Sequence, residues 1–330
     1  GLTAGYAHPQ FSIHRGELQM ILFDAVVRAI GSERVITGHK LAAFEPRGDQ
    51  VLTRFVDRET GAPRGDVMAD VLIAADGIHS AVRAQLYPNE GPPKWNGVQM
   101  WRGVTEGVPY LSGASQIWSG WNRQKFVAYP ISRKRADEGR ALINWIADVR
   151  MDATDMPRRE DWNRAGNLDD FLPKFECWRW PFFDVPAIIR GAESVYEFPM
   201  VDRDPLDRWS FGRVTLLGDA AHPMYPIGSN GASQAILDAE AIAESLATIA
   251  DPVAALKDYE AKRLPMAAGI VHMNRKQGID VILDVVEERA PNGFANIDDV
   301  IPRAELESIV ARYKQVAGHR QNSAHTKEAK

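Results

Sequence analysis

Between residues 218 and 232 the chain places glycines, prolines and an aspartate in a pattern suited to binding an electron-rich group. The surrounding stretch, Arg213–Leu246, begins with a run of Val, Thr and Leu over residues 214–217 that is typical of a buried strand. A tight Gly218-Asp219 turn and a loop with two prolines follow, and from Gly231 onward apolar residues recur at helical spacing. A strand that leads through glycines into a helix gathers free backbone N–H groups at the positive end of that helix. We therefore predict a binding site for an electron-rich group at this point.

The same stretch resembles the GD motif of FAD-dependent aromatic hydroxylases, the single-component flavoprotein monooxygenases similar to para-hydroxybenzoate hydroxylase. Residues 223–239 are most similar to the branch of this family that acts on phenazine carboxylates. In place of the family's usual G-Q-G-x-N, the chain carries GSNGA at residues 228–232, which keeps the backbone pattern and changes the side chains. Without the resemblance, a strand-turn-helix unit of an ordinary α/β protein would explain the stretch. The matching residues are Gly218-Asp219-Ala220-Ala221-His222-Pro223, then Pro226, Gly228 and the helical pair Asp238-Ala239.

The resemblance implies how this stretch would hold FAD. Backbone N–H groups of residues 228–232 would face the N1/C2=O edge of the flavin, where the reduced ring accumulates negative charge. Asp219 would accept hydrogen bonds from the ribitol hydroxyls, and Pro226 and Tyr225 would wall the flavin where the C4a-hydroperoxide forms. A histidine beside a proline is typical of a structural loop residue, so we do not assign His222 as a catalytic base.

Two further motifs of the family occur nearer the start of the chain. Arg15 stands in a match to the I-x-R-x-x-L pattern, at the start of a helix predicted over residues 15–31, and the resemblance places it near the ribitol and phosphates. Alone, it would also suit a solvated arginine at a helix start. Asp76-Gly77, with Ser80 and Arg83 after it, follows an apolar strand at residues 70–75 and resembles the DG motif that lies against the FAD pyrophosphate. Gly77 allows a sharp turn, and Asp76 and Ser80 can bind helix N–H groups. The predicted cofactor-binding residues are therefore Arg15, Asp76, Gly218, Asp219, Pro226, Gly228, Asn230, Gly231 and Ala232.

The middle of the chain has β-strand character at residues 98–108, 115–118, 125–131 and 141–149. Consecutive strands without helices between them predict an antiparallel sheet, and the resemblance implies that this sheet roofs the flavin and binds the substrate. A carboxylated aromatic needs an aromatic wall and a guanidinium. Trp101 and Tyr129 also suit a role in sheet packing, and the sequence leaves both interpretations open. The predicted substrate-pocket residues are Trp101, Arg102, Tyr129 and Tyr225.

The predicted fold is α/β, an FAD/NAD(P)-binding Rossmann-like fold of the para-hydroxybenzoate hydroxylase type. We expect a discontinuous FAD-binding domain over residues 1–94 and 193–250, which includes a β-hairpin at residues 35–56 and a returning strand at 194–201. An antiparallel substrate-binding sheet domain follows over residues 95–192, and a C-terminal helical region over 251–330, with Pro265 kinking or splitting a helix. The family's first βαβ unit is absent, because no G-x-G-x-x-G occurs in the chain. We therefore expect a piece of a longer protein, which by itself holds FAD poorly.

The composition, with 45% hydrophobic and 25% charged residues, is that of a soluble globular protein. A net charge of −5 gives no reason to expect nucleic acid or an anionic membrane as a partner. The single cysteine, Cys177, excludes an internal disulfide and fits a reducing compartment. The chain shows no signal-peptide pattern and no apolar run that could span a bilayer. We expect a cytoplasmic monomer or homodimer.

The resemblance implies that NAD(P)H reduces FAD, that O2 adds at the flavin C4a, and that the hydroperoxide hydroxylates a small, phenazine-carboxylate-like aromatic substrate. The cofactor carries this chemistry, so we assign no metal and no acid–base residue. Two alternatives remain open: a flavin oxidoreductase of the same fold that does not hydroxylate, and a flavin-free remnant that serves as a binding module. No W-x-W-x-I-P signature occurs, which argues against a flavin halogenase.

Overall fold

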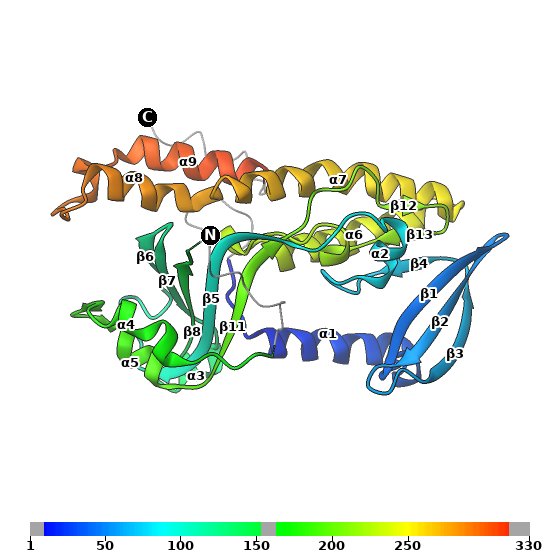
Figure 1. Ribbon diagram of the computed structural model, residues 1–330, viewed down its shortest axis with the longest axis horizontal. Helices are drawn as coiled ribbons and strands as arrows, with labels where there is room; N and C mark the ends of the chain where they lie inside the picture. Colours follow the sequence, from blue (N-terminus) through cyan, green and yellow to red (C-terminus); the bar gives the residue numbers. More distant parts are fainter. Residues whose placement is uncertain (1–9, 153–162, 317–330) are drawn as a thin grey trace.

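The computed structural model describes residues 10–152 and 163–316, and its largest sheet has five antiparallel strands in the order β11-β5-β8-β7-β6 (Figure 1). The sequence predicted this antiparallel sheet from four consecutive runs, and the prediction is confirmed. The outer ends of the predicted first and last regions, residues 1–9 and 317–330, lie outside the described residues. The strands are β5 (Lys94–Gly107), β6 (Ile117–Trp121), β7 (Gln124–Pro130), β8 (Ala141–Arg150) and β11 (Ala192–Asp202).

Strand β11 differs from its predicted place. The sequence assigned residues 194–201 to the first domain, whereas β11 pairs with β5 along most of its length and forms an edge of the large sheet. Its residues 198–201 are buried, so the pairing also brings apolar side chains into the core. Residues 192–202 therefore join the sheet of the predicted region 95–192, and the division of the chain into domains stays a prediction.

One face of the large sheet is covered by short helices. Alternate residues point to opposite faces of a strand, and on this face Trp145, Phe126 and Phe175 are fully buried in an aromatic cluster. The Trp145 indole N–H donates to Thr105 Oγ1 at 3.0 Å, which satisfies the polar atom of the largest buried side chain. The covering elements are η3 (Leu168–Asp170), α4 (Leu172–Phe175), α5 (Val185–Arg190) and the short pair β9 (Arg179–Trp180) and β10 (Phe183–Asp184), while α3 (Arg133–Asp137) joins β7 to β8.

Two smaller sheets lie beside the large one. Strands β4 (Leu72–Ala74) and β13 (Val214–Leu216) run parallel, with β12 (Ser210–Phe211) antiparallel at the edge. The predicted hairpin is β1 (His39–Arg47) and β2 (Gln50–Asp57), and β3 (Pro63–Ala69) extends it to a three-stranded sheet. The sequence did not predict β3, because six of its seven residues are exposed and it lacks the apolar alternation of a half-buried strand.

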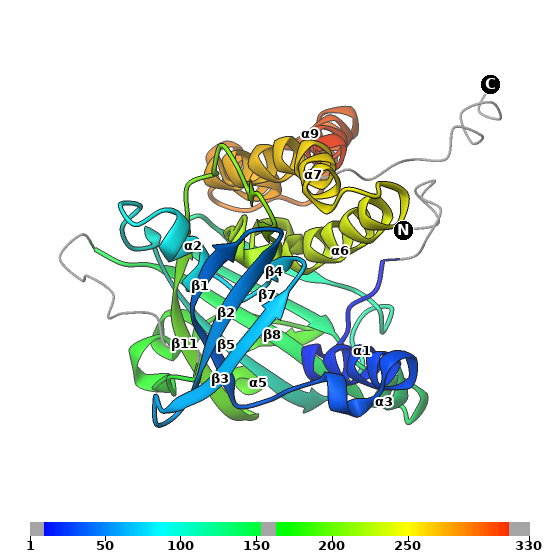
Figure 2. The same ribbon diagram turned by 90° about the vertical axis from the view of Figure 1, so that its right-hand side faces the viewer.

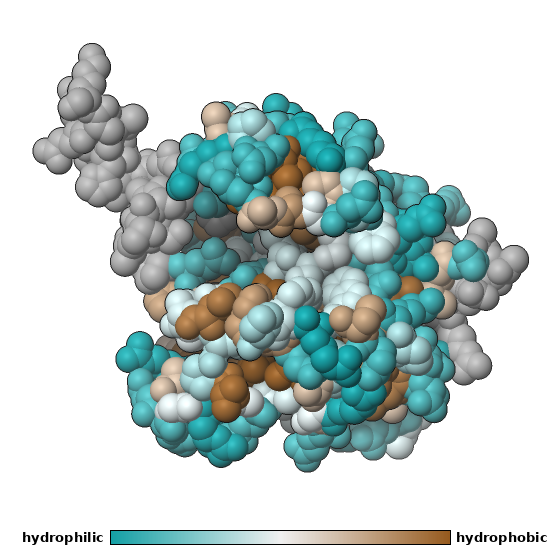
Figure 3. All heavy atoms as spheres, turned by 90° about the vertical axis from the view of Figure 1, so that its left-hand side faces the viewer, coloured by the Kyte–Doolittle hydropathy of each residue, from teal (hydrophilic) through white to brown (hydrophobic). Residues whose placement is uncertain are grey.

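Helices form a layer that extends from the parallel strands to the end of the large sheet formed by β6 and β7 (Figure 1). The predicted C-terminal helices are confirmed over the described residues, and Pro265 lies inside a continuous α7 rather than splitting it. None of the helices that the structure describes is both long and apolar enough to cross a membrane. In Figure 3 the outer surface of this upper layer carries mostly hydrophilic residues. The helices are α2 (Ala81–Leu86), α6 (Gly231–Thr248), α7 (Pro252–Arg275), α8 (Val281–Arg289) and α9 (Arg303–Val316), with 3-10 turns η4 (Gly218–Ala220), η5 (Ile227–Ser229), η6 (Gly278–Asp280) and η7 (Ile297–Asp299).

Helix α1 (Arg15–Ile30), followed by the turn η2 (Ser32–Arg34), forms where the sequence predicts it, but none of its residues is buried. Ile21 and Ile30 are each 57% exposed, and Leu22 is 52% exposed. Figures 1 and 2 show α1 at the lower edge of the molecule, on the opposite side from α7. Helix α1 therefore exposes several large apolar side chains that the described residues do not cover.

Candidate functional site

The DG and GD turns lie next to each other because they follow paired parallel strands. Ala74 at the end of β4 pairs with Leu216 at the end of β13, and Asp76 and Asp219 come shortly after them. The carboxyl ends of parallel strands are where α/β sheets commonly bind ligands. The Asp76 carboxylate accepts a hydrogen bond from the Ala81 N–H at 2.7 Å, so it caps the start of α2.

Arg83 of the DG motif holds the GD turn from one side. Its side chain is 1% exposed and donates to the backbone carbonyls of Ala220 at 3.1 Å and Ala221 at 2.8 Å. The Glu90 carboxylate pairs with the same guanidinium, which balances its buried charge. The sequence supplied Arg83 as part of a motif, and the structure shows that it links the two motifs through the backbone.

Asp238 of α6 holds the GD turn from the other side. Its fully buried carboxylate accepts hydrogen bonds from the Gly218 N–H at 3.1 Å and from Arg263 Nε at 2.7 Å, and it lies 2.5 Å from His222 Nε2. Burial raises the pKa of the Asp238 carboxyl, but the hydrogen bonds from His222 and Arg263 outweigh this effect and hold the pKa below its usual value. His222 is 2% exposed, which fits the structural loop role that the sequence favoured.

The glycine loop, residues 226–231, leads into the start of α6, which has no side-chain cap. Gly228 has φ 72° and Ser229 has φ 56°, so two successive residues adopt the left-handed region. Asn230 occupies the N-cap position, yet its side chain makes no capping hydrogen bond. Gly231 is half-buried and Ala232 is exposed, as is Pro226 before the turn. The first N–H groups of α6 are therefore directed, without a side-chain cap, into a region that a ligand can reach.

The charge of Arg15 acts on both Asp219 and Arg102. The Asp219 carboxylate is exposed but closely flanked by protein, which raises its pKa, while His222 and Arg15 act in the opposite direction. Burial lowers the pKa of the Arg102 guanidinium, and the positive charge of Arg15 lowers it further. The charge of Arg15, at the start of α1, therefore acts both on the GD turn and on the large sheet.

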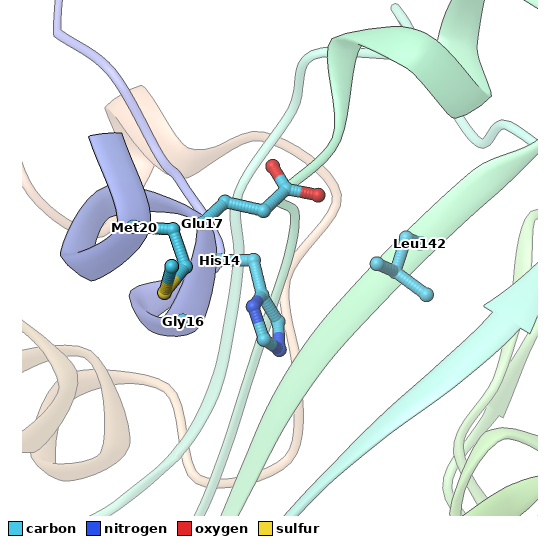
Figure 4. Close-up of a pocket in the computed structure, with 5 residues that line it drawn as sticks. All are labelled: His14, Gly16, Glu17, Met20 and Leu142. Atoms are coloured by element: carbon cyan, nitrogen blue, oxygen red, sulfur yellow. The ribbon is translucent and has the colours of Figure 1, made fainter. Parts of the chain in front are cut away.

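A cleft of about 510 Å³ opens beside this region, between the start of α1 and strand β8. His14, just before α1, and Gly16, Glu17 and Met20 of α1 line one side, and Leu142 lines the opposite side (Figure 4). The cleft is shallow and wide open to solvent, so by itself it does not define a ligand-binding site.

The face of the large sheet that carries Leu142 also carries several polar groups. Arg102, Asn144 and Tyr129 lie on the same face of β5, β8 and β7, because Arg102 pairs with Ile146 and Tyr129 pairs with Asn144. Tyr129 and the charge of Asp148 favour the protonated Arg102 guanidinium. Within the described residues Asn144 Nδ2 is buried without a hydrogen-bond partner. The sequence analysis did not predict Asn144 as a site residue. Asn144 lies two residues after Leu142 on β8, so strand alternation places both on the same face of the sheet.

Trp101 does not belong to this group, which corrects its predicted place in the substrate pocket. Neighbouring residues of a strand point to opposite faces, so Trp101 cannot share a face with Arg102. Trp101 is 3% exposed and stacks on Phe171, with ring centroids 4.7 Å apart, on the covered side of the sheet. The packing interpretation that the sequence left open is the one that the structure supports for this residue.

Tyr225 lies between the glycine loop and the large sheet. It is 6% exposed and packs with Val98, Met100 and Phe198 on the same face as Arg102. Burial raises the pKa of the Tyr225 hydroxyl to about 12, and Asp202 adds to the shift. Its side chain therefore joins the loop to the sheet, and its role towards a substrate stays a prediction.

The comparisons with known proteins identify the family. Residues 12–168 and 186–274 match the family described as FAD binding domain. Phenazine 1,6-dicarboxylic acid hydroxylase PhzS of Lysobacter antibioticus is 42% identical over 96% of this chain and 75% of its own length. The 3-amino-4-hydroxybenzoate 2-monooxygenase PtnB3 of Streptomyces platensis is 32% identical, over 83% of this chain and 64% of its own length. Among solved structures, Klebsiella pneumoniae HpxO in complex with FAD and uric acid is 25% identical, with a TM-score of 0.66 over 92% of this chain and 67% of that one.

The chain therefore belongs to the FAD binding domain family of flavoprotein monooxygenases, and it shares the α/β fold of the FAD-dependent aromatic hydroxylases. The resemblance carried by the GD and DG motifs is confirmed. The residues present fit FAD: the uncapped start of α6 suits the electron-rich edge of a flavin, and Asp219 beside Arg15 suits hydroxyl and phosphate groups. The chain spans three quarters or less of the curated relatives compared above.

Proposed function

We propose that this chain forms the substrate-binding part and much of the flavin site of an NAD(P)H-dependent monooxygenase that hydroxylates a carboxylated aromatic of phenazine-like size. The observation that carries the proposal is that the charge of Arg15, at the start of α1, acts both on Arg102 of the large sheet and on Asp219 of the GD turn. We assign Asp219 to the cofactor side of the site and Arg102 to its substrate side.

Arg102 suits the carboxylate of the substrate. It forms no ion pair with a carboxylate of the described residues, and Arg15 adds a second positive charge nearby. A guanidinium in a partly desolvated position binds a carboxylate by charge-assisted hydrogen bonds. Asn144 Nδ2, buried and without a partner in the part of the chain that the structure describes, supplies a further donor on the same sheet face. The similar protein PhzS is named a phenazine 1,6-dicarboxylic acid hydroxylase, and the substrate in that name is a carboxylated aromatic.

The protein's own residues would position the flavin, shield its reacting face from water and stabilise its negative charge. Bound FAD would take a hydride from NAD(P)H and activate O2 at its C4a position for transfer of one oxygen atom to the aromatic ring. The N–H groups at the start of α6 would stabilise negative charge on the flavin edge, and exposed Pro226 beside buried Tyr225 would keep water from the reacting face. A cytoplasmic location and a monomeric or homodimeric state stay predictions.

Product analysis tests the proposal. The FAD-loaded protein is incubated with O2, NADH or NADPH, and phenazine-1-carboxylate or phenazine-1,6-dicarboxylate, and the products are analysed by mass spectrometry with ¹⁸O2. An added oxygen atom derived from O2 is expected. Oxidation of NAD(P)H with no oxygen in the product would assign a flavin oxidoreductase that does not hydroxylate. A folded protein that ignores FAD would assign a flavin-free binding module.

Substitution of Arg102 tests the substrate class. A hydrogen bond to a charged group contributes about 1.5–3 kcal/mol, so Arg102→Gln should lower kcat/KM for the carboxylated substrate by about 10- to 150-fold. The same variant should change kcat/KM for unsubstituted phenazine by much less, because that ring offers no carboxylate. Equal losses for both substrates would refute the assignment of Arg102.

A further inference from the structure

Lys125 on β7 pairs with two carboxylates that come from different parts of the fold. Its Nζ lies 3.1 Å from Asp148 Oδ2 on the neighbouring strand β8, and it also pairs with Asp280 of η6, in the helical layer. All three side chains are nearly buried, with exposed fractions of 12% for Lys125, 8% for Asp148 and 12% for Asp280. The Oδ1 atoms of both aspartates have no hydrogen-bond partner among the residues that the structure describes. The group therefore has two carboxylates for one ammonium, and one acceptor atom of each carboxylate is unused.

Asp148 is a diagonal neighbour of Arg102 on the same face of the large sheet. Arg102 of β5 pairs with Ile146 of β8, and Asp148 lies two residues further along β8, so strand alternation places both charged side chains on one face. The Cα atoms of diagonal neighbours in an antiparallel pair are about 7–8 Å apart, which long side chains can bridge. The charge of Asp148 also acts on the Arg102 guanidinium. Asp148 is therefore placed within reach of an ion pair with Arg102.

Arg102 does not use this carboxylate in the structure. Its guanidinium carbon lies 5.7 Å from the centre of the Phe198 ring, and the guanidinium has a side-chain hydrogen bond with Tyr129. Asp148 is bound to Lys125 instead. Burial lowers the pKa of the Lys125 ammonium, but the charges of its two carboxylate partners outweigh this effect and raise the pKa, so the ammonium stays protonated. The positive charge next to Asp148 is therefore that of Lys125, and Arg102 is left without a carboxylate partner among the described residues.

We propose that Lys125 is a positioning residue for the substrate: by pairing with Asp148, it keeps the Arg102 guanidinium free to bind the carboxylate of the substrate. Lys125 does not touch the substrate in this arrangement and acts only through Asp148 and Arg102. The inference rests on the proposed function in one respect, namely that Arg102 binds a carboxylate. Without Lys125, Asp148 is a buried carboxylate without a cation, a state costly enough to draw in a guanidinium within reach. Asp148 then competes with the substrate for Arg102.

Two double variants test this competition with a matched change in charge. Lys125→Met/Asp280→Asn removes the ammonium and leaves Asp148, the carboxylate beside Arg102. Lys125→Met/Asp148→Asn removes the ammonium and leaves Asp280 instead. Each variant keeps one of the two buried carboxylates, so a general loss of stability affects both in a similar way. Only the first variant keeps a competitor for Arg102.

Equilibrium binding of phenazine-1-carboxylate to the FAD-loaded protein is the readout. A hydrogen bond to a charged group is strong enough to change a binding constant by about tenfold or more. Lys125→Met/Asp280→Asn is therefore expected to raise the Kd by about that factor. The Kd of Lys125→Met/Asp148→Asn should stay near the parent value, as should that of Lys125→Arg, which keeps the positive charge. Unsubstituted phenazine, which has no carboxylate, should bind the two double variants equally.

A single substitution keeps the inference testable even if loss of Lys125 prevents folding. Asp148→Asn leaves Lys125 paired with Asp280 and removes only the competing carboxylate. It should bind phenazine-1-carboxylate at least as tightly as the parent protein, and weaker binding would overturn the inference. Equal Kd values of the two double variants for phenazine-1-carboxylate would overturn it as well.

Arg102→Gln separates the inference from the proposed function. If Arg102→Gln binds phenazine-1-carboxylate as tightly as the parent protein, the assignment of Arg102 fails and the inference fails with it. If Arg102→Gln weakens binding while the two double variants bind equally, only the inference fails. Binding requires no turnover, so a failure to hydroxylate phenazine carboxylates would leave these readouts intact.

Discussion

Replacing Asp238 by alanine is expected to lower the free energy of unfolding by at least about 3 kcal/mol, because it removes the carboxylate at the centre of a buried network. Asp238 is fully buried and binds Arg263 at 2.7 Å, His222 at 2.5 Å and the Gly218 N–H at 3.1 Å. Arg263 is only 5% exposed, so its guanidinium would stay in the interior without its carboxylate.

The magnitude follows from what the substitution leaves behind. Breaking a buried ion pair by removal of one partner costs about 3–5 kcal/mol. The Gly218 N–H, left unpaired beside the carboxylate's former place, adds about 1–3 kcal/mol. The two costs share one site and are not fully additive, since the Arg263 side chain also binds Gln234 Oε1 at 2.6 Å. Because native proteins have a free energy of unfolding of about 5–15 kcal/mol in total, Asp238→Ala should still fold but be markedly less stable.

Equilibrium urea unfolding, followed by tryptophan fluorescence, measures the loss. Glu244→Ala is the matched control, because Glu244 lies on the same helix, is exposed and pairs with Lys262 at 3.3 Å at the surface. It should leave the free energy of unfolding nearly unchanged. A loss below about 1 kcal/mol for Asp238→Ala would refute the idea that this carboxylate supports the network.

The same network predicts a dependence on pH. The folded-state pKa of Asp238 lies below its usual value of 3.8. Its contribution to stability is therefore fully present above that pH and is lost as the pH falls through the lower folded-state value. Asp238→Asn should remove this acid-dependent part, which a comparison of urea midpoints at pH 6 and at pH 3 would detect.

Two further outcomes are expected. The Tyr225 hydroxyl has a pKa of about 12 in the folded protein, against 10.0 when unperturbed, so its contribution to the free energy of unfolding is complete below pH 10 and is lost as the pH rises towards 12. Tyr225→Phe should therefore make the alkaline decline of the urea midpoint shallower, and an unchanged slope would contradict this. Lys125→Met should cost about 3–5 kcal/mol, because Lys125 lies between two buried carboxylates, 3.1 Å from Asp148 and paired with Asp280. Lys262→Met, at an exposed ion pair, is its control in the same unfolding experiment, and equal losses would show that burial is not the cause.

Local patterns in the sequence were sufficient for most elements and for both motifs. The strand before Gly218, the helix after Gly231 and the runs that form β5, β7 and β8 carry their signal within a few residues, because burial on one or both faces fixes their apolar pattern. Asp76 was predicted to bind helix N–H groups, and its bond to the Ala81 N–H confirms this. Turn chemistry and capping act over a few residues, so the sequence states them directly.

Local sequence patterns could not predict which way side chains point or which distant residues they contact. Trp101 and Arg102 have equally suitable chemistry for an aromatic carboxylate, and only the register of β5 decides which of the two faces the aromatic cluster. Tyr313 lies 86 positions after Ile227 and has no local feature that indicates the contact. The apolar face of α1 predicts a helix correctly, but the pattern contains no information on what covers it.

The way the glycine loop is held explains how its side chains can depart from the family's usual pattern. Arg83 binds carbonyls of Ala220 and Ala221, Asp238 binds the N–H of Gly218, and Tyr313 binds the carbonyl of Ile227. All these contacts are made to the backbone, from α2, α6 and α9 respectively. A loop fixed through its backbone keeps its N–H groups in place whichever small side chains it carries, provided that Gly228 leaves room for the tyrosine. Apart from Asn230, whose buried side chain binds Tyr313, residues 229–232 are therefore free to vary in chemistry to a degree that Gly228 is not, and saturation mutagenesis scored by FAD retention should show the fewest accepted residues at position 228.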